Sequence, residues 1–391
     1  MEKWEKSQTT NYLANKDLFV NFFNNIKNPN RKLKIRKIKN RIICKQYNQV
    51  EYLNIAIGKK VTKYNEDCVL LDVRDWTYNH YGHFMVDVMN RMWYLQDEKY
   101  KKMKIICCLE DYSYLFEWFY LLGIQKEQII LIKEGEYYKF KSIYVPEQSM
   151  GSLYGTNNLH YNFVKTFNEI SKNVSDKYNY EKIFISRKKI VGSGLHKNIC
   201  DNIFGEHKIA KIFEKNGYKI IYPEDYSLIE QVQLFKKCKV LASIGGSGLH
   251  NSVFLPDKSE VVCLFRDYHY TSFSCQCAID FLKGHTTNYI DASINPFSYI
   301  YGTIPACSNC IVGVNQFVKN FFDDKGFVYK LKDLEVNKEE FLQYIIDFGK
   351  RYGMERKANR PKSRIPKFLV MMMCAVMFNK RKRHQFRKKF F

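Results

Sequence analysis

The chain has 391 residues, of which 46% are apolar and 16% aromatic. This length exceeds the size at which one core usually keeps growing, so two domains are expected, and the composition excludes a disordered chain. The formal net charge of +23 lies mostly in residues 27–45 and 356–391, which contain nine and thirteen Lys or Arg and no acidic residue. A clustered excess of this kind indicates an anionic partner.

The N-terminus lacks the apolar run and small-residue cleavage site of a secretory signal, so we expect a cytoplasmic protein. The twelve cysteines are then expected to be reduced core residues. Cys275, Cys277, Cys307 and Cys310 could instead hold zinc as four thiolates, although their spacing is irregular for a zinc ribbon.

Short apolar runs alternate with helix-length amphipathic stretches, a pattern typical of parallel sheets covered by helices. The first half predicts strands from residues 68, 104, 129 and 141 and helices over 80–96 and 113–122. The second half predicts strands from residues 181, 219, 239 and 260 and helices over 206–216, 228–237 and 248–255. Segment 31–44 alternates charged and apolar residues, as a half-exposed strand would. We therefore expect domains over 1–176 and 177–335, a helix over 336–355, and a basic tail over 356–391.

Residues 239–255, KVLASIGGSGLHNSVFL, contain a buried strand, a glycine-rich loop and the start of a helix. The loop is Gly245, Gly246, Ser247 and Gly248. Glycines let a ligand approach the backbone closely, and the free N–H groups at a helix N-terminus favour an anion such as a diphosphate. The segment has neither the GK[ST] of a P-loop nor a full GxGxxG, so an ordinary tight turn is the alternative.

The helix before this strand begins with Ser227 and Glu230 in the S-x-x-E spacing of a capping box. Gln231 could face a cleft and hold a ribose or sugar hydroxyl. The whole run 217–256 resembles glycosyltransferase family 61, and its matching positions are Gly217-Tyr218, Pro223-Glu224, Glu230-Gln231, Gly246-Ser247-Gly248, Leu249 and Asn251. The family's usual loop histidine is replaced by Gly245, and His250, one turn into the helix, is a possible substitute phosphate contact.

Residues 79–95 place His83, Asp87 and Arg91 four apart, on one stripe of a helix. A surface ladder of ion pairs is one explanation of such a stripe. The family carries a similar H-x-x-x-D helix, which implies a catalytic role. Asp87 would be the base that takes a proton from the acceptor hydroxyl, His83 would orient it or be the base itself, and Arg91 would hold the acceptor or the base.

Ser186 and Arg187 follow the strand predicted from residue 181, at the edge where open α/β sheets bind ligands. An arginine there can hold a diphosphate with two hydrogen bonds, whereas a solvated basic turn is the alternative. The resemblance supports Ser-Arg here and implies a second Arg with an Asn-Glu further on. This chain offers only Lys197, Asn198 or Asn202, and Glu206 as substitutes.

The resemblance implies a GT-B arrangement, in which two Rossmann-like domains face each other across a cleft and the enzyme inverts the anomeric carbon. The donor would contact Ser186, Arg187, Glu230, Gln231, Gly246, Ser247, Gly248 and Asn251. Asp72 and Asp75 lack the spacing of the Asp-x-Asp that binds the metal in metal-dependent transferases, so we expect neither metal nor cofactor.

In the basic tail, an apolar run over 368–378 is flanked by Lys and Arg. It is shorter than the roughly 20 residues that span a bilayer, so we expect it to lie on an anionic membrane surface. A helix packed on the core followed by a disordered tail is the alternative. The leading hypothesis is a transferase that makes capsule or cell-surface polysaccharide at the inner face of the cell membrane, with a glycan or lipid-linked acceptor. The alternatives are an inactive glycan-binding or scaffold subunit and a nucleic-acid-binding protein, for which no motif is present.

Overall fold

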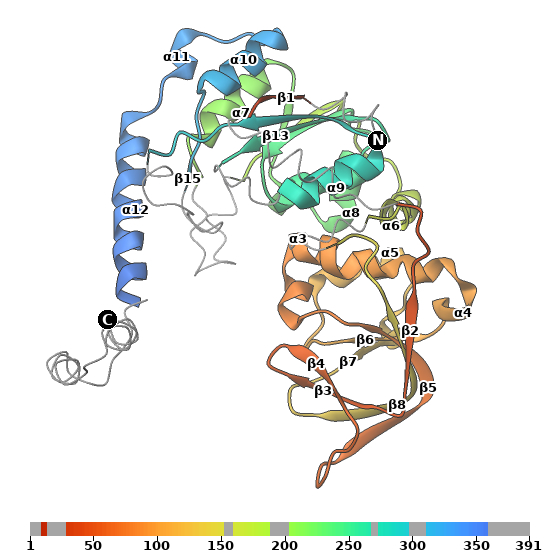
Figure 1. The fold of residues 1–391 in the computed structure, drawn as a ribbon. Helices are drawn as coiled ribbons and strands as arrows, with labels where there is room; N and C mark the ends of the chain where they lie inside the picture. Colours follow the sequence, from red (N-terminus) through yellow and green to blue (C-terminus); the bar gives the residue numbers. More distant parts are fainter. Residues whose placement is uncertain are drawn as a thin grey trace, which may run out of the picture.

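The computed structural model describes residues 9–13, 29–151, 159–187, 203–266, 273–296 and 310–358. Within these ranges the chain forms two main sheets with helices around them, so it is an α/β protein as predicted (Figure 1). The predicted positions Lys197, Asn198, Asn202 and Cys307 lie outside the described residues, as does the tail from residue 359 onward.

The first sheet has the strand order β4-β3-β8-β5-β6-β7, with β2 also paired to β8. Its strands are β2 Ile35–Lys39, β3 Ile42–Gln46, β4 Gln49–Leu53, β5 Val61–Leu71, β6 Lys104–Cys107, β7 Ile129–Leu131 and β8 Tyr137–Pro146. Strands β8, β5, β6 and β7 are parallel, and β2 and β3 are antiparallel to β8. The four strands predicted in this half are confirmed. Segment 31–44 forms two strands rather than one because Asn40 between them has a left-handed φ of 55°.

The helix predicted over 80–96 is a continuous helical stretch whose winding changes along its length. A 3-10 helix η1 (Asp75–Asn79) precedes α3 (Tyr81–His83), which continues as the π-helix η2 (Phe84–Val88) and the 3-10 helix η3 (Met89–Gln96). The π turn lies at Asp87, and such turns are frequent at functional sites. The remaining helical elements of this half are α4 Glu98–Lys101, η4 Tyr114–Phe116, α5 Glu117–Leu121, η5 Lys126–Gln128 and α6 Asn162–Lys172.

The second sheet is parallel, with the order β1-β14-β13-β12-β9-β11. Its strands are β1 Thr9–Tyr12, β9 Lys182–Ile185, β11 Lys219–Ile221, β12 Val240–Ile244, β13 Glu260–Phe265 and β14 Thr286–Asp291. From β9 onward this is the 2-1-3-4-5 order of a doubly wound sheet. The order in which successive strands are added reverses between β9 and β12. The four predicted strands are confirmed. The structure adds β14, and it adds β1 from the opposite end of the chain.

Helices cover both faces of the second sheet (Figure 1). Helices α7 (Glu206–Lys215) and α10 (Gln316–Asp324) lie on the outer face, and α8 (Leu228–Phe235) and α9 (Phe273–Lys283) lie on the face toward the first sheet. The other elements are η7 Pro223–Asp225, η8 Ser247–Phe254, the strand pair β10 Ile203–Phe204 and β15 Cys310–Ile311, α11 Leu331–Leu334 and α12 Lys338–Ala358. No helix in the described ranges is long and apolar enough to cross a membrane.

One hydrophobic core connects the two sheets. The ring of Phe254 in the second half lies 6.2 Å from that of Trp118 and 5.4 Å from that of Phe167 in the first half. All three side chains are buried, and they belong to a single cluster that extends into both sheets. Aromatic side chains bury more area than any others, so this junction holds the two halves together.

Candidate active site

Ser186-Arg187 and the glycine loop lie side by side, as predicted, at the point where the second sheet reverses its strand order. Strands β9 and β12 are paired through Ile185 and Ser243, so the residues after each strand emerge together. A Cβ atom at Gly246 would lie 2.0 Å from Nη1 of Arg187. Only glycine leaves room for the guanidinium here, and the carboxyl edge at this point is where open α/β sheets bind ligands.

Glu206, at the start of α7, supports this arrangement from behind. Its buried carboxylate accepts a hydrogen bond from the backbone N–H of Arg187 at 2.7 Å and another from the Ser186 hydroxyl. Burial raises the pKa of Glu206. The Glu206 side chain was predicted as a possible contact of the sugar donor. In the structure it accepts hydrogen bonds that position Ser186 and Arg187.

The glycine loop meets the first half of the chain directly at α3. A Cβ atom at Gly82 would lie 2.3 Å from Oγ of Ser247, so the backbone at Gly82 packs directly against the Ser247 side chain. A Cβ atom at Gly248 would lie 3.3 Å from Cγ2 of Ile185, so this backbone also packs closely. The helical turns that carry His83 and Asp87 are thereby fixed against the loop.

Tyr81 links the same two segments through its side chain. Its hydroxyl lies 2.6 Å from Oδ1 of Asn251 and 3.0 Å from Oε1 of Gln231. The Gln231 amide nitrogen donates to the carbonyl oxygens of Pro223 and Tyr226, and that of Asn251 donates to the carbonyl of Gly248. The polar atoms of both amides therefore have protein partners that join the two halves, and their contact with a donor stays a prediction.

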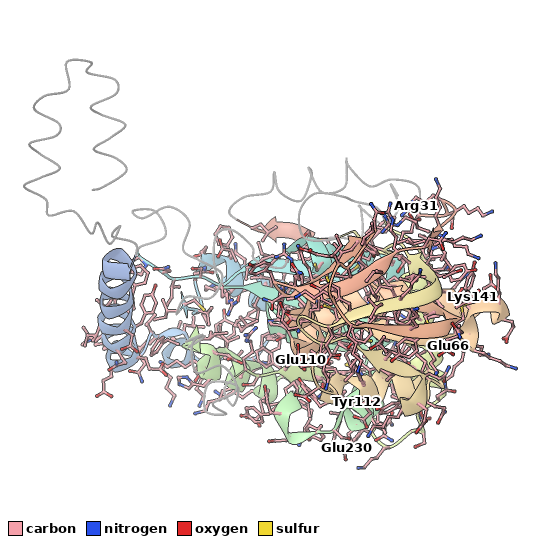
Figure 2. All side chains as sticks on the ribbon, turned by 90° about the horizontal axis from the view of Figure 1, so that it is seen from below. Arg31, Glu66, Glu110, Tyr112, Lys141 and Glu230 are labelled. Atoms are coloured by element: carbon pink, nitrogen blue, oxygen red, sulfur yellow. The ribbon has the colours of Figure 1, made fainter. Side chains whose placement is uncertain are left out.

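Glu230 forms the predicted capping box with Ser227. Its carboxylate also pairs with Lys177 at 2.6 Å, and this pair lowers the pKa of Glu230 to about 2. Figure 2 shows Glu230 at the periphery of the molecule. These contacts stabilise the start of α8, and they give no support to the predicted donor contact.

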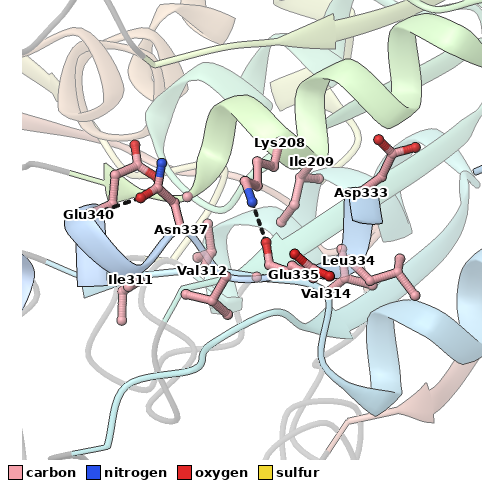
Figure 3. Close-up of a pocket in the computed structure, with 13 residues that line it drawn as sticks. Lys208, Ile209, Ile311, Val312, Val314, Asp333, Leu334, Glu335, Asn337 and Glu340 are labelled. Carbon is pink, nitrogen blue, oxygen red and sulfur yellow. Dashed lines mark hydrogen bonds between the residues drawn. The ribbon is translucent and has the colours of Figure 1, made fainter. Parts of the chain in front are cut away.

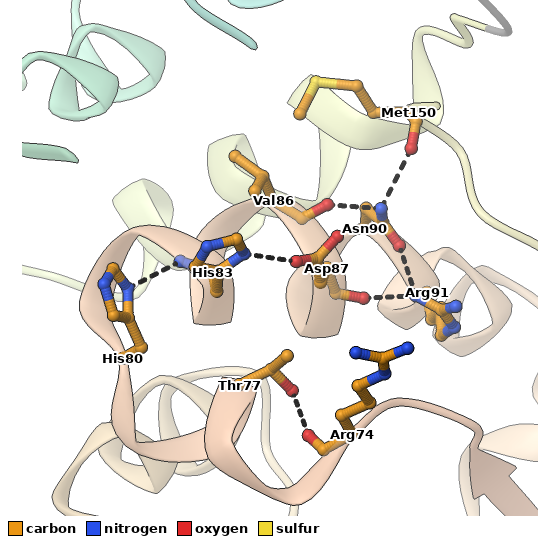
Figure 4. Close-up of polar contacts among 9 residues, drawn as sticks. All are labelled: Arg74, Thr77, His80, His83, Val86, Asp87, Asn90, Arg91 and Met150. Carbon is orange, nitrogen blue, oxygen red and sulfur yellow. Dashed lines mark hydrogen bonds and ion pairs between the residues drawn. The ribbon is translucent and has the colours of Figure 1, made fainter. Parts of the chain in front are cut away.

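His83 and Asp87 form a close pair in the first half (Figure 4). Nδ1 of His83 lies 2.7 Å from Oδ2 of Asp87, and the two side chains are 24% and 17% exposed. The backbone N–H of His83 donates to Nδ1 of His80, and the Trp76 ring lies edge-on 4.5 Å from the His83 ring. A carboxylate at Nδ1 fixes the tautomer and leaves Nε2 free to accept a proton.

Arg91 does not complete the ladder of ion pairs. Its side chain is buried, and Nη1 donates to the backbone carbonyl of Asp87 rather than to the carboxylate, and to Oδ1 of Asn90 at 3.2 Å. Burial lowers the pKa of Arg91. The alternative of a surface ladder is therefore wrong at Arg91. This side chain instead stabilises the helical stretch through its hydrogen bond to the Asp87 carbonyl.

Arg74 and Trp76 were not singled out from the sequence, yet they follow β5 at the edge that carries His83. Trp76 is 42% exposed, and Arg74 is exposed with no hydrogen bond or ion pair of its guanidinium to the described residues. Figure 4 shows Arg74 extending toward the helix that carries Asp87 and Arg91. Their position directly after a buried strand could have identified them, by the rule that identified Arg187.

His250 is buried and ends a chain of hydrogen bonds. Nδ1 of His250 lies 3.1 Å from Oε1 of Gln276, whose amide nitrogen donates to Oδ1 of Asp280 at 2.9 Å. The Tyr289 hydroxyl donates to the other Asp280 oxygen. Because the Gln276 amide nitrogen faces Asp280, its oxygen faces His250, whose Nδ1 must carry the proton. Burial lowers the pKa of His250 to about 4. It is therefore neutral near pH 7, and its role as a substitute phosphate contact stays a prediction.

The cysteines of the hypothetical zinc site are dispersed. Cys275 and Cys277 are buried in α9, Cys310 is buried in β15, and the Cys277 thiol donates to the Tyr289 hydroxyl at 3.2 Å. The described part of the chain contains no group of three or more His, Cys, Asp or Glu side chains that could hold a metal ion.

A small hollow lies elsewhere, among α7, β15 and the segment that leads into α12 (Figure 3). The Lys208 ammonium donates to the carbonyl of Glu335 across it. None of the predicted donor or acceptor contacts lines it.

An arginine and a glycine loop lie at the reversal point of a doubly wound sheet, and a His-Asp pair is held against that loop. This arrangement is typical of an α/β enzyme whose ligand binds at the edge of the sheet. The model of the family Glycosyltransferase 61 matches residues 81–262, from α3 to β13. The chain is thus a glycosyltransferase with a family 61 domain, and the resemblance seen in its sequence is confirmed. No curated protein matches the chain.

Proposed function

We propose that this glycosyltransferase transfers a sugar from a nucleotide-sugar donor to a glycan or lipid-linked acceptor, with inversion at the anomeric carbon and without a metal ion. Its two sheets would act as the two Rossmann-like domains of a GT-B enzyme. The observation that carries the proposal is that segments following strands of the first sheet contact segments following strands of the second. Arg187 and Gly246 lie on one side, the His83–Asp87 pair lies on the other, and Gly82 touches Ser247 between them.

The donor diphosphate would bind at the reversal point of the second sheet. Arg187 would donate two hydrogen bonds to it, and the N–H groups at the start of η8 would donate from the glycine loop. These groups balance the negative charge that develops on the leaving nucleoside diphosphate. The same charge balance supports transfer without a divalent cation.

The acceptor hydroxyl would lose its proton to the His83–Asp87 pair. The geometry favours Nε2 of His83 as the atom that takes the proton, with Asp87 stabilising the imidazolium through Nδ1. The acceptor oxygen then bonds to the anomeric carbon as the bond from that carbon to the diphosphate breaks. The exposed face of Trp76 would support the acceptor sugar, and Arg74 would lie within the same surface.

The test is sugar transfer and donor hydrolysis over a panel of nucleotide-sugars. Asp87→Asn and His83→Gln should each lower kcat about a hundredfold or more, because both remove general-base catalysis. Arg187→Ala should raise the donor KM about tenfold to a hundredfold through the loss of charge-assisted hydrogen bonds. Glu340→Gln breaks a second His–carboxylate pair, to His207 at 3.3 Å, and is the matched control that should leave turnover unchanged.

Unchanged turnover in both Asp87→Asn and Arg187→Ala would refute the site. Binding of nucleotide-sugar with no turnover of any donor by the wild-type chain would favour the scaffold hypothesis instead. Excess EDTA should leave transfer intact. Loss of activity in EDTA that Mn²⁺ restores would refute the metal-independent mechanism.

The proposed setting is the inner face of the cell membrane, in capsule or cell-surface polysaccharide synthesis. The support is the positive charge on both sides of the apolar run 368–378 within residues 356–391. This arrangement suits an anionic lipid surface. Retention on anionic liposomes with no gel shift of oligonucleotides is the expected result. A salt-sensitive gel shift would favour nucleic-acid binding instead.

A further inference from the structure

The loop between β4 and β5 projects from the end of the first sheet that lies farthest from the second sheet (Figure 1). Its sequence over residues 54–60 is NIAIGKK. Ile55 is 70% exposed and Ile57 is 87% exposed, whereas isoleucine is among the side chains most often buried. Single exposed apolar side chains are normal, but two of them two residues apart on one projecting loop require an explanation.

The charges along this stretch of the sequence have one sign. Lys59, Lys60 and Lys63 follow them, and the sequence contains no acidic residue between Glu51 and Glu66. The three lysines are exposed. Apolar side chains at a tip, with a collar of lysines behind them, match the layers of a bilayer surface, where acyl chains lie beneath anionic headgroups.

We infer that this loop inserts Ile55 and Ile57 into the surface of an anionic lipid bilayer, with Lys59, Lys60 and Lys63 at the headgroups. A second copy of the chain is a poorer partner for this loop. Contact between the loops of two copies would bring like charges together around the isoleucines. The inference does not depend on transfer activity or on the basic tail.

Co-sedimentation of the full chain with lipid vesicles tests the inference. The vesicles contain phosphatidylcholine alone, or phosphatidylcholine mixed with phosphatidylglycerol. Replacing both Ile55 and Ile57 by Ser should lower the partition coefficient on the mixed vesicles about tenfold or more. The reason is that the variant lacks the two apolar side chains that the bilayer would bury. Replacing Lys59 and Lys60 by Gln should lower it on the mixed vesicles and leave weak binding to pure phosphatidylcholine unchanged.

A matched control removes exposed apolar surface elsewhere. Val328 and Leu331 are 73% and 80% exposed in the second half, and their replacement by Ser should leave vesicle binding unchanged. All of these positions are exposed, so the variants should keep the circular dichroism of the wild type. Vesicle binding of the Ile55/Ile57 variant equal to that of the wild type would overturn the inference.

A second measurement reports insertion rather than adsorption. Tryptophan at position 57 (Ile57→Trp) should be quenched by brominated acyl chains beyond the quenching seen in the wild-type chain. Absence of added quenching would count against insertion. A change of sedimentation coefficient without vesicles in the Ile55/Ile57 variant, with vesicle binding intact, would identify a second copy as the occupant and would equally overturn the inference.

Discussion

Asp280 is a buried carboxyl group within the hydrogen-bond chain that starts at His250, and its replacement by Asn should change how stability depends on pH. Burial raises the pKa of Asp280 to about 7. In the unfolded chain the pKa of an aspartate is about 3.9. Between these values the folded state keeps a proton that the unfolded state has released. The free energy of unfolding therefore falls as the pH rises through this window, and it levels off above about pH 7.

The expected size follows from the width of the window. Each pH unit within it is worth about 1.36 kcal/mol, so the wild type should lose about 3 kcal/mol through Asp280 from about pH 5 to about pH 8. Asp280→Asn cannot titrate. Its stability relative to the wild type should therefore rise by about this amount over the same range. His250 and His285, whose pKa values burial lowers to about 4, are present in both proteins and cancel in the difference.

Urea unfolding followed by far-UV circular dichroism at the two pH values measures this difference. Asp323→Asn is a suitable control, because Asp323 is an exposed carboxylate paired with Lys319 at 2.6 Å. It should show little of the pH-dependent gain. A difference between Asp280→Asn and wild type that is the same at both pH values would refute the assignment of a raised pKa to Asp280.

Two further predictions concern the glycine loop and the junction of the two halves. Gly246→Ala should weaken nucleotide-sugar binding strongly in a titration, because its Cβ would lie 2.0 Å from Nη1 of Arg187, whereas Gly245→Ala, with no contact shorter than 3.4 Å, should bind nearly as the wild type does. Equal affinities of the two variants would contradict the close approach. Tyr81→Phe should cost about 1 to 3 kcal/mol in urea unfolding, because it removes the single hydroxyl proton that the buried oxygens of Asn251 and Gln231 share. Removal of the 64% exposed Tyr114 hydroxyl should cost little, and equal losses would rule out the link.

Much of the fold could be predicted because the strands are continuous apolar runs. Residues 183–185 of β9 and 241–244 of β12 are buried, and buried parallel strands have this pattern. The alternation of strand and helix places the carboxyl ends of parallel strands at one edge. The proximity of Arg187 and the glycine loop followed from that rule, without any knowledge of the side-chain contacts.

The roles of individual polar side chains could not be predicted in the same way. The spacing of four put Arg91 on the stripe of His83 and Asp87, but the stretch winds as a π-helix and then a 3-10 helix, and Arg91 becomes buried. His250 lies one turn into its helix, and only the packing of α9 against that helix gives it Gln276 as a partner. Burial by distant segments decided both outcomes, and local periodicity carries no information about it.

The strand β14, with the sequence TTNYID, escaped prediction for a related reason. Its polar residues Thr287, Asn288 and Asp291 are all buried. The Asn288 amide donates to Glu260, and Asp291 accepts from the backbone N–H of Ser293. A sequence pattern counts such residues as exposed. No strand was therefore predicted over residues 286–291.

The position of β1 has a consequence for how the chain is made. Thr9–Tyr12 is synthesised before its partner β14, which follows nearly three hundred residues later. Until then the strand β1 cannot pair with β14, and the Tyr12 hydroxyl cannot reach Asp324, to which it donates at 2.6 Å. This edge of the second sheet can therefore close only after β14 has been synthesised. A fragment that begins after residue 13 would leave the backbone of β14 exposed as an unpaired edge, which is a known route to aggregation.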